Sequence, residues 1–148
     1  MKPRALIGRG LLAFAIAATP GFQVTADWSF GHINNPDWPP HAKYHLIVYH
    51  LTLVIFSMVA LYVCWGKWRF RRFPASFSTF AVFAFWLPYY LAALFPQGSP
   101  YATPELAQRA VPAQFVVGGI LAATSILGYA LARGGDDDDD PAVTPSRG

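Results

Sequence analysis

Long apolar stretches alternate with short polar ones along this chain of 148 residues. Three stretches, at about residues 44–65, 75–95 and 112–132, are apolar over the ~20 residues that a helix needs to cross a bilayer. A first stretch, at about 10–26, is also apolar, but it follows a basic N-terminus and ends in small residues, as a cleavable signal peptide does. With this stretch retained, the pattern predicts an all-α, integral membrane four-helix bundle.

Composition supports a membrane protein, since 54% of the residues are hydrophobic and only 13% are charged, against ~25% in soluble domains. The chain divides into a transmembrane domain, 1–133, and a Gly-, Asp- and Pro-rich tail, 134–148, which we expect to be disordered. Basic residues gather at the ends of the apolar stretches, so the positive net charge does not indicate nucleic-acid binding. Membrane lipids are the expected partners, and the sequence fixes no oligomeric state.

The distribution of Lys and Arg predicts the orientation. The N-terminus is basic and the short connection 66–74 carries four Lys or Arg residues, whereas Lys43 and Arg109 are the only ones in the other two connections. Because basic loops stay in the cytoplasm, we expect both termini inside and the loop between the first two helices on the exoplasmic face. The protein would then be a multi-pass protein of the plasma or inner membrane.

All four histidines lie between residues 32 and 50, close to the expected membrane surface. On a helix, His45 lies about 40° and Tyr49 about 80° around the axis from His41, so the three share one face. His50 lies about 180° from His41 and is expected to face away. His32 precedes the helix, in a loop rich in Asn, Pro and Trp that we expect to fold back over the helix ends as an ordered cap.

The turn before the second helix has a structural role of its own. Asn, Pro and Asp at 34–37 are typical turn residues, and Pro39 with Pro40 suits the first turn of a helix. Asp37 is therefore expected chiefly to cap this helix.

Imidazole suits both proton transfer near neutral pH and metal binding, so two chemistries fit the cluster. In the first, an isomerase or cyclase acts on a lipophilic substrate, with His41 and His45 as acid and base, His32 positioning the substrate and Tyr49 donating a hydrogen bond. In the second, His32, His41 and His45 hold zinc or copper, with Asp37 as a fourth ligand. A third possibility is a non-catalytic membrane subunit or scaffold. In either functional case, loss of His45 should matter more than loss of His50.

Two later helices add weaker signals. Trp86, Tyr89 and Tyr90 either line a cavity beneath the histidines or simply pack between helices. Gly118, with Ala122 and Ser125, gives the last helix a small-residue face for close packing.

The run from His32 to His45, His-Ile-Asn-Asn-Pro-Asp-Trp-Pro-Pro-His-Ala-Lys-Tyr-His, resembles the signature of a poorly characterised family of small four-helix integral membrane proteins. That signature is His-Ile-x-Asn-Pro-x-Trp-Pro-Pro-His-Ala, then Lys or Arg, then Tyr or Phe, then His. The resemblance covers this motif and the order of the helices, and it implies a fold but no activity. A looser similarity is to membrane isomerases and sterol-binding proteins of four or five helices. Their intramembrane acids have no counterpart in the second to fourth helices of this chain.

Overall fold

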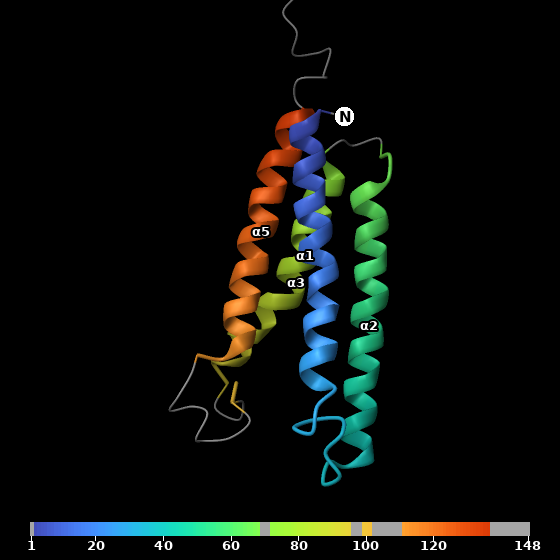
Figure 1. The fold of residues 1–148 in the computed structure, drawn as a ribbon, viewed down its shortest axis with the longest axis vertical. Coiled ribbons are helices and arrows are strands. Elements are labelled where there is room, and N and C mark those ends of the chain that lie inside the picture. The colour runs from blue at the N-terminus through green and yellow to red at the C-terminus, as the bar shows by residue number, and fades with distance from the viewer. Residues whose placement is uncertain (1, 69–71, 96–98, 102–110, 137–148) are drawn as a thin grey trace, which may run out of the picture.

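The computed structural model describes residues 2–68, 72–95, 99–101 and 111–136, with side chains up to 133. These ranges contain no strand and form four long helices: α1 (Pro3–Asp27), α2 (Pro40–Trp65), α3 (Phe73–Ala92) and α5 (Ala113–Asp136). Each is long and apolar enough to cross a membrane. The described chain is therefore an all-α four-helix bundle, as the hydropathy pattern predicts, and it has the character of a small multi-pass membrane protein (Figure 1).

The helices are displaced from the predicted bounds at several ends. α1 and α2 each begin with a proline in the first turn, at Pro3 and Pro40, where the missing N–H costs no hydrogen bond. Both start earlier than hydropathy alone indicates, because a helix can extend beyond the apolar stretch into polar residues. α5 continues to Asp136, so the start of the predicted tail is helical, and 137–148 lie outside the described residues.

α1 contacts each of the other three helices, and its interface with α5 is the largest in the bundle (Figure 1). Gly8 and Gly128 permit this close approach. A Cβ added at Gly8 would lie 2.4 Å from the backbone nitrogen of Ala132, and one at Gly128 would lie 2.9 Å from the carbonyl oxygen of Gly8. Membrane helices commonly associate through such small residues, which let the two backbones pack directly.

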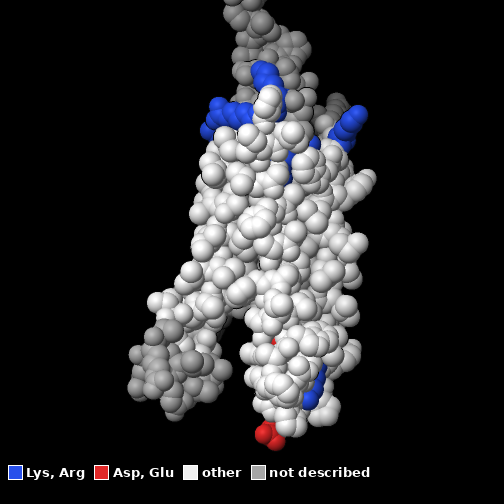
Figure 2. Space-filling model, viewed as in Figure 1, with Lys and Arg blue, Asp and Glu red and all other residues white. Residues whose placement is uncertain are grey.

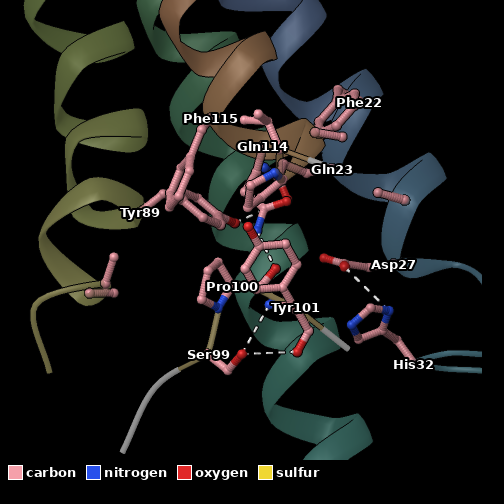
Figure 3. A pocket seen from close by; sticks show the side chains of 16 residues that line it. Phe22, Gln23, Asp27, His32, Tyr89, Ser99, Pro100, Tyr101, Gln114 and Phe115 are labelled. Carbon is pink, nitrogen blue, oxygen red and sulfur yellow. Dashed lines mark hydrogen bonds and ion pairs between the residues drawn. The ribbon is translucent and has the colours of Figure 1, made fainter. Parts of the chain in front are cut away.

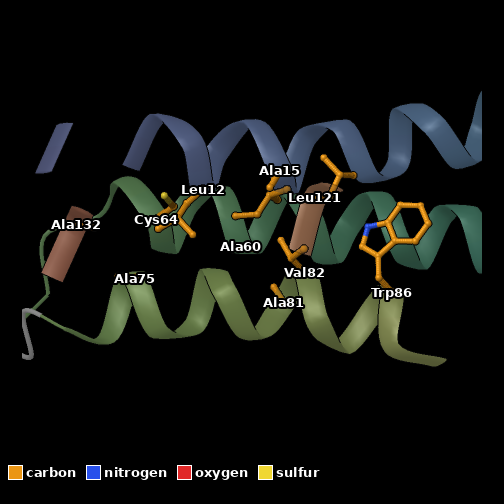
Figure 4. Close-up of a cluster of buried hydrophobic side chains, with 11 residues drawn as sticks. Leu12, Ala15, Ala60, Cys64, Ala75, Ala81, Val82, Trp86, Leu121 and Ala132 are labelled. Carbon is orange, nitrogen blue, oxygen red and sulfur yellow. The ribbon is translucent and has the colours of Figure 1, made fainter. Parts of the chain in front are cut away.

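Trp86 on α3 is the largest side chain in the core, and only 1% of it is exposed (Figure 4). A Cβ added at Gly118 would lie 2.7 Å from its ring, so one member of the predicted small face on α5 accommodates the indole. The indole Nε1 donates to Thr19 Oγ1 at 3.0 Å, and Thr19 donates to the Ala15 carbonyl at 2.9 Å. Trp86 is thus a satisfied core residue that joins α3 to α1.

The two ends of the bundle differ in charge. The start of α1, the end of α5 and the end of α2 lie at one end, and most of the Lys and Arg visible in Figure 2 gather there. The loop between α1 and α2 lies at the opposite end, where Lys43 is the one described cation. This distribution is the one that places both termini in the cytoplasm, and the orientation itself stays a prediction.

Candidate functional site

The loop between α1 and α2 folds back onto the end of α1. Ser29 accepts backbone hydrogen bonds from His32 at 3.1 Å and from Asn34 at 3.0 Å, and the Ile33 N–H donates to the Asp27 carbonyl at 3.2 Å. The His32 ring packs edge-on against Trp38, with ring centroids 5.3 Å apart. These contacts hold the imidazole of His32 beside the last turn of α1.

The predicted capping role of Asp37 is wrong. Pro39 is the N-cap of α2, and no side chain hydrogen-bonds to this helix start. The backbone N–H of Asp37 donates instead to Asn35 Oδ1 at 2.9 Å, which closes a tight turn within the loop. The residue at the N-cap position is a proline, whose side chain has no acceptor, so the helix begins without a side-chain cap.

Asp27, the last residue of α1, is the centre of the site. One carboxylate oxygen lies 3.1 Å from His50 Nε2 on α2, and the other lies 3.8 Å from His32 Nδ1 in the loop. The side chain of His50 is 4% exposed, that of Asp27 16% and that of His32 37%. A carboxylate at the end of a membrane helix is thus held between one buried and one accessible imidazole.

The surroundings of His50 determine where its protons lie. Its Nδ1 is 2.7 Å from the Leu46 carbonyl, which can only accept, so Nδ1 carries a hydrogen. In the neutral ring Nε2 then carries a lone pair, and its close contact with an ionised Asp27 would be repulsive. One additional proton, on either Nε2 or the carboxyl group, makes the contact favourable. The Asp27–His50 contact thus has the distance of an ion pair, although the two groups are not aligned as a hydrogen bond.

A second polar chain crosses the bundle beside this pair. The hydroxyl groups of Tyr49 on α2 and Tyr89 on α3 lie 2.7 Å apart, and Tyr89 donates to Gln23 Oε1 on α1 at 3.0 Å. Gln23 is 3% exposed, and its Nε2 has no hydrogen-bond partner in the part of the chain that the structure describes. A buried amide donor without a partner is costly and is usually satisfied by water or a ligand.

Both polar groups open onto a cleft of about 780 Å³ at this end of the bundle, where Figure 2 shows the surface divided by a notch. Asp27, Gln23 and Tyr89 line it, whereas His50 and Tyr49 stand behind them on α2. The cleft brings together α1, the end of α3 and the start of α5 (Figure 3). Its other described lining residues are mostly apolar or aromatic: Phe22, Ala26, His32, Ala92, Ala93, Ser99, Pro100, Tyr101, Val111, Pro112, Ala113, Gln114 and Phe115.

The structure divides the four histidines into two groups. His41 and His45 are exposed on the first turns of α2 and contact each other, with 2.9 Å between their Nε2 atoms. His32 and His50 flank Asp27 instead. The expected convergence of three histidines is therefore not found, because the loop turns His32 back toward α1. Among the described residues, no three His, Cys, Asp or Glu side chains are arranged to hold a metal, so the set with Asp37 is not assembled.

His50 faces away from His41 and His45, as expected: it is buried, whereas they are exposed, and it contacts Asp27 from behind the lining of the cleft. Tyr49 keeps a place in the site through Tyr89. The sequence pattern did not identify Asp27 and Gln23 as site residues. A signal for them exists, since Thr19, Gln23 and Asp27 recur every four residues along α1 and so form one polar face of an apolar helix.

This site can donate and accept protons at two points of one apolar cleft: the Asp27 pair on one side and the Tyr89 hydroxyl on the other. It presents no described phosphate-binding loop or nucleophile. Comparisons of the chain with models of protein families, with curated proteins and with solved structures find no match. What the site does must therefore follow from its own geometry.

Proposed function

We propose that this protein is a membrane enzyme that carries out acid–base chemistry, an isomerisation or cyclisation, on a lipophilic substrate bound in the cleft. The observation that carries the proposal is the contact of 3.1 Å between the Asp27 carboxylate and the buried His50 imidazole, at the edge of an apolar cavity. Acids and bases that are partly removed from water, and tied to a second titratable group, are typical of sites that transfer protons.

The cleft favours a lipophilic substrate. Its volume of about 780 Å³ is within the range of small-molecule sites, and apolar side chains form most of its described walls. The cleft lies between helices that are apolar enough to be in a membrane, so such a molecule can enter from the lipid. The few polar groups, Gln23 and Asp27 among them, would orient it.

In the reaction we propose, Asp27 is the group that exchanges a proton with a carbon of the substrate, because its carboxylate reaches the cleft. His50 supplies or takes up a proton from behind, and Leu46 fixes the imidazole through its carbonyl. Tyr89, which accepts from Tyr49, can turn its hydroxyl hydrogen from Gln23 to an oxygen of the substrate, or return a proton at a second position. Adding one proton and removing another leaves the composition unchanged, so an isomerisation or cyclisation of this kind needs no co-reactant.

The proposal can be tested without knowing the substrate. Purified protein in lipid nanodiscs is incubated in D₂O with a total lipid extract of the host, and mass spectrometry identifies lipids that gain deuterium at carbon. Wild-type protein should label or convert one lipid class. Asp27→Asn, which keeps the size of the side chain but removes the base, should reduce the rate by about 10²–10⁴-fold, as expected for loss of an acid–base group.

His50→Gln and His45→Gln form a matched pair on α2. The first should slow labelling strongly and the second should leave it unchanged, because His45 does not line the cleft or contact Asp27. Thermal unfolding of each variant in detergent checks that the fold is kept. Labelling by Asp27→Asn at the wild-type rate would refute the proposal. Tight lipid binding without labelling in the wild type would indicate a non-catalytic carrier or subunit.

A further inference from the structure

His41 and His45 form a second cluster that the acid–base site does not use. Both side chains are exposed on the first two turns of α2, and neither lines the cleft. Their rings are nearly perpendicular, at 88°, and their centroids are 4.4 Å apart. The two Nε2 atoms are 2.9 Å apart, so one Nε2–H donates to the other Nε2. If both rings carry their proton on Nδ1, two lone pairs meet at the same place.

The spacing of these nitrogens suits one metal ion. Imidazole nitrogens bind metals at about 2.0–2.1 Å, so two ligands at right angles are about 2.9 Å apart, whereas a tetrahedral angle separates them by about 3.3 Å. The observed 2.9 Å matches the right angle. Right-angled pairs of imidazoles belong to tetragonal sites, which are typical of Cu(II), and copper also binds such nitrogens more tightly than zinc does.

We infer that His41 and His45 chelate Cu(II) at the surface of α2, separately from the cleft. In the part of the chain that the structure describes, no third His, Cys, Asp or Glu joins the pair, so water completes the coordination. Such a site has open positions and exchanges its ion readily, unlike a closed structural site. Lys43 lies about 200° around the helix from His41 and so points its charge away from the ion.

The test uses the full chain without a polyhistidine tag, in detergent, titrated with copper sulfate against a competing chelator. Wild-type protein should bind one Cu(II) whose electron paramagnetic resonance spectrum shows splitting by two nitrogens. His41→Gln and His45→Gln should each weaken binding at least about tenfold, since loss of even a residue that only orients a ligand costs 10–100-fold. Each should also leave splitting by at most one nitrogen.

Three controls make the result specific. His32→Gln removes a histidine from elsewhere and should bind copper as the wild type does. Combining His45→Gln with Leu46→His keeps the number of histidines but moves one off the shared face, and it should bind as weakly as His45→Gln alone. The Asp run at 136–140 can bind copper only through oxygen and so gives no nitrogen splitting. Equal binding in all variants, or a wild-type spectrum without two nitrogens, would overturn the inference.

Discussion

Replacing Gly8 by alanine tests the crossing of α1 and α5, on which the position of Asp27 depends. The added Cβ would lie 2.4 Å from the Ala132 nitrogen and 2.6 Å from the Gly128 carbonyl oxygen. Both obstacles are backbone atoms, so a change of rotamer cannot relieve the clash. Gly10, on the same helix, has no atom within 4 Å of an added Cβ and provides the matched control.

The expected loss of stability in Gly8→Ala follows from the geometry of the contact. Ordinary contact begins at 3.4 Å, so the helices must part by about 1 Å along their closest approach. Overpacking of this kind costs about 1–3 kcal/mol. A glycine-to-alanine change also favours the helix by up to about 1 kcal/mol, but this gain is common to both variants and cancels in the comparison. Gly8→Ala should therefore be less stable than Gly10→Ala by about 1–3 kcal/mol.

The assay is reversible unfolding in mixed micelles, with helix content followed by circular dichroism for wild type and both variants. Gly10→Ala should unfold at or slightly above the wild-type midpoint, and Gly8→Ala clearly below it. If the two variants unfold together, α1 and α5 do not cross at Gly8 and the packing described above is incorrect. A Gly8→Ala variant that is more stable than Gly10→Ala would refute the argument more directly.

Three further predictions concern the core, the polar chain and the orientation. Trp86→Phe should destabilise the protein by about 1–3 kcal/mol because it removes the donor to Thr19. Thr19→Val should cost less in the Trp86→Phe background than it does alone, which a double-mutant cycle would measure. Tyr49→Phe should slow lipid deuteration less than Tyr89→Phe does, since only Tyr89 lines the cleft; an equal or larger effect of Tyr49→Phe would assign it a direct role. Reporter fusions in the α1–α2 loop and in the α2–α3 connection should give exoplasmic and cytoplasmic signals respectively, and the reverse result would invert the proposed orientation.

Hydropathy was sufficient for the fold because the requirement for a membrane helix is local. About 20 apolar residues with their backbone hydrogen bonds satisfied internally form such a helix whatever their neighbours are. The same reasoning could not find the close contact at Gly8 and Gly128. It identified a small-residue face at Gly118 on α5, but which glycine meets which helix depends on crossing angles that no single segment encodes.

The histidines also separate what one helix encodes from what the packing of several helices decides. Helical periodicity correctly paired His41 with His45 and separated His50, because these relations lie within one helix. It could not show that the loop returns His32 to α1, or that His50 faces a carboxylate from another helix. Asp27 was visible in the sequence as one of three acids before the terminal Asp run, yet its partners come from segments outside α1.

The sequence by itself therefore determined the four apolar helices, the distribution of basic residues and the neighbours along each helix, since all are set by composition and period. Only the tertiary structure decided which polar groups meet in the cleft. Asp27 at the end of α1 lines the cleft with Tyr89 near the end of α3, and His50 contacts Asp27 from within α2, because these parts of the three helices lie at one level of the bundle. Contacts between helices depend on their rotation and crossing, which arise from packing the whole bundle at once.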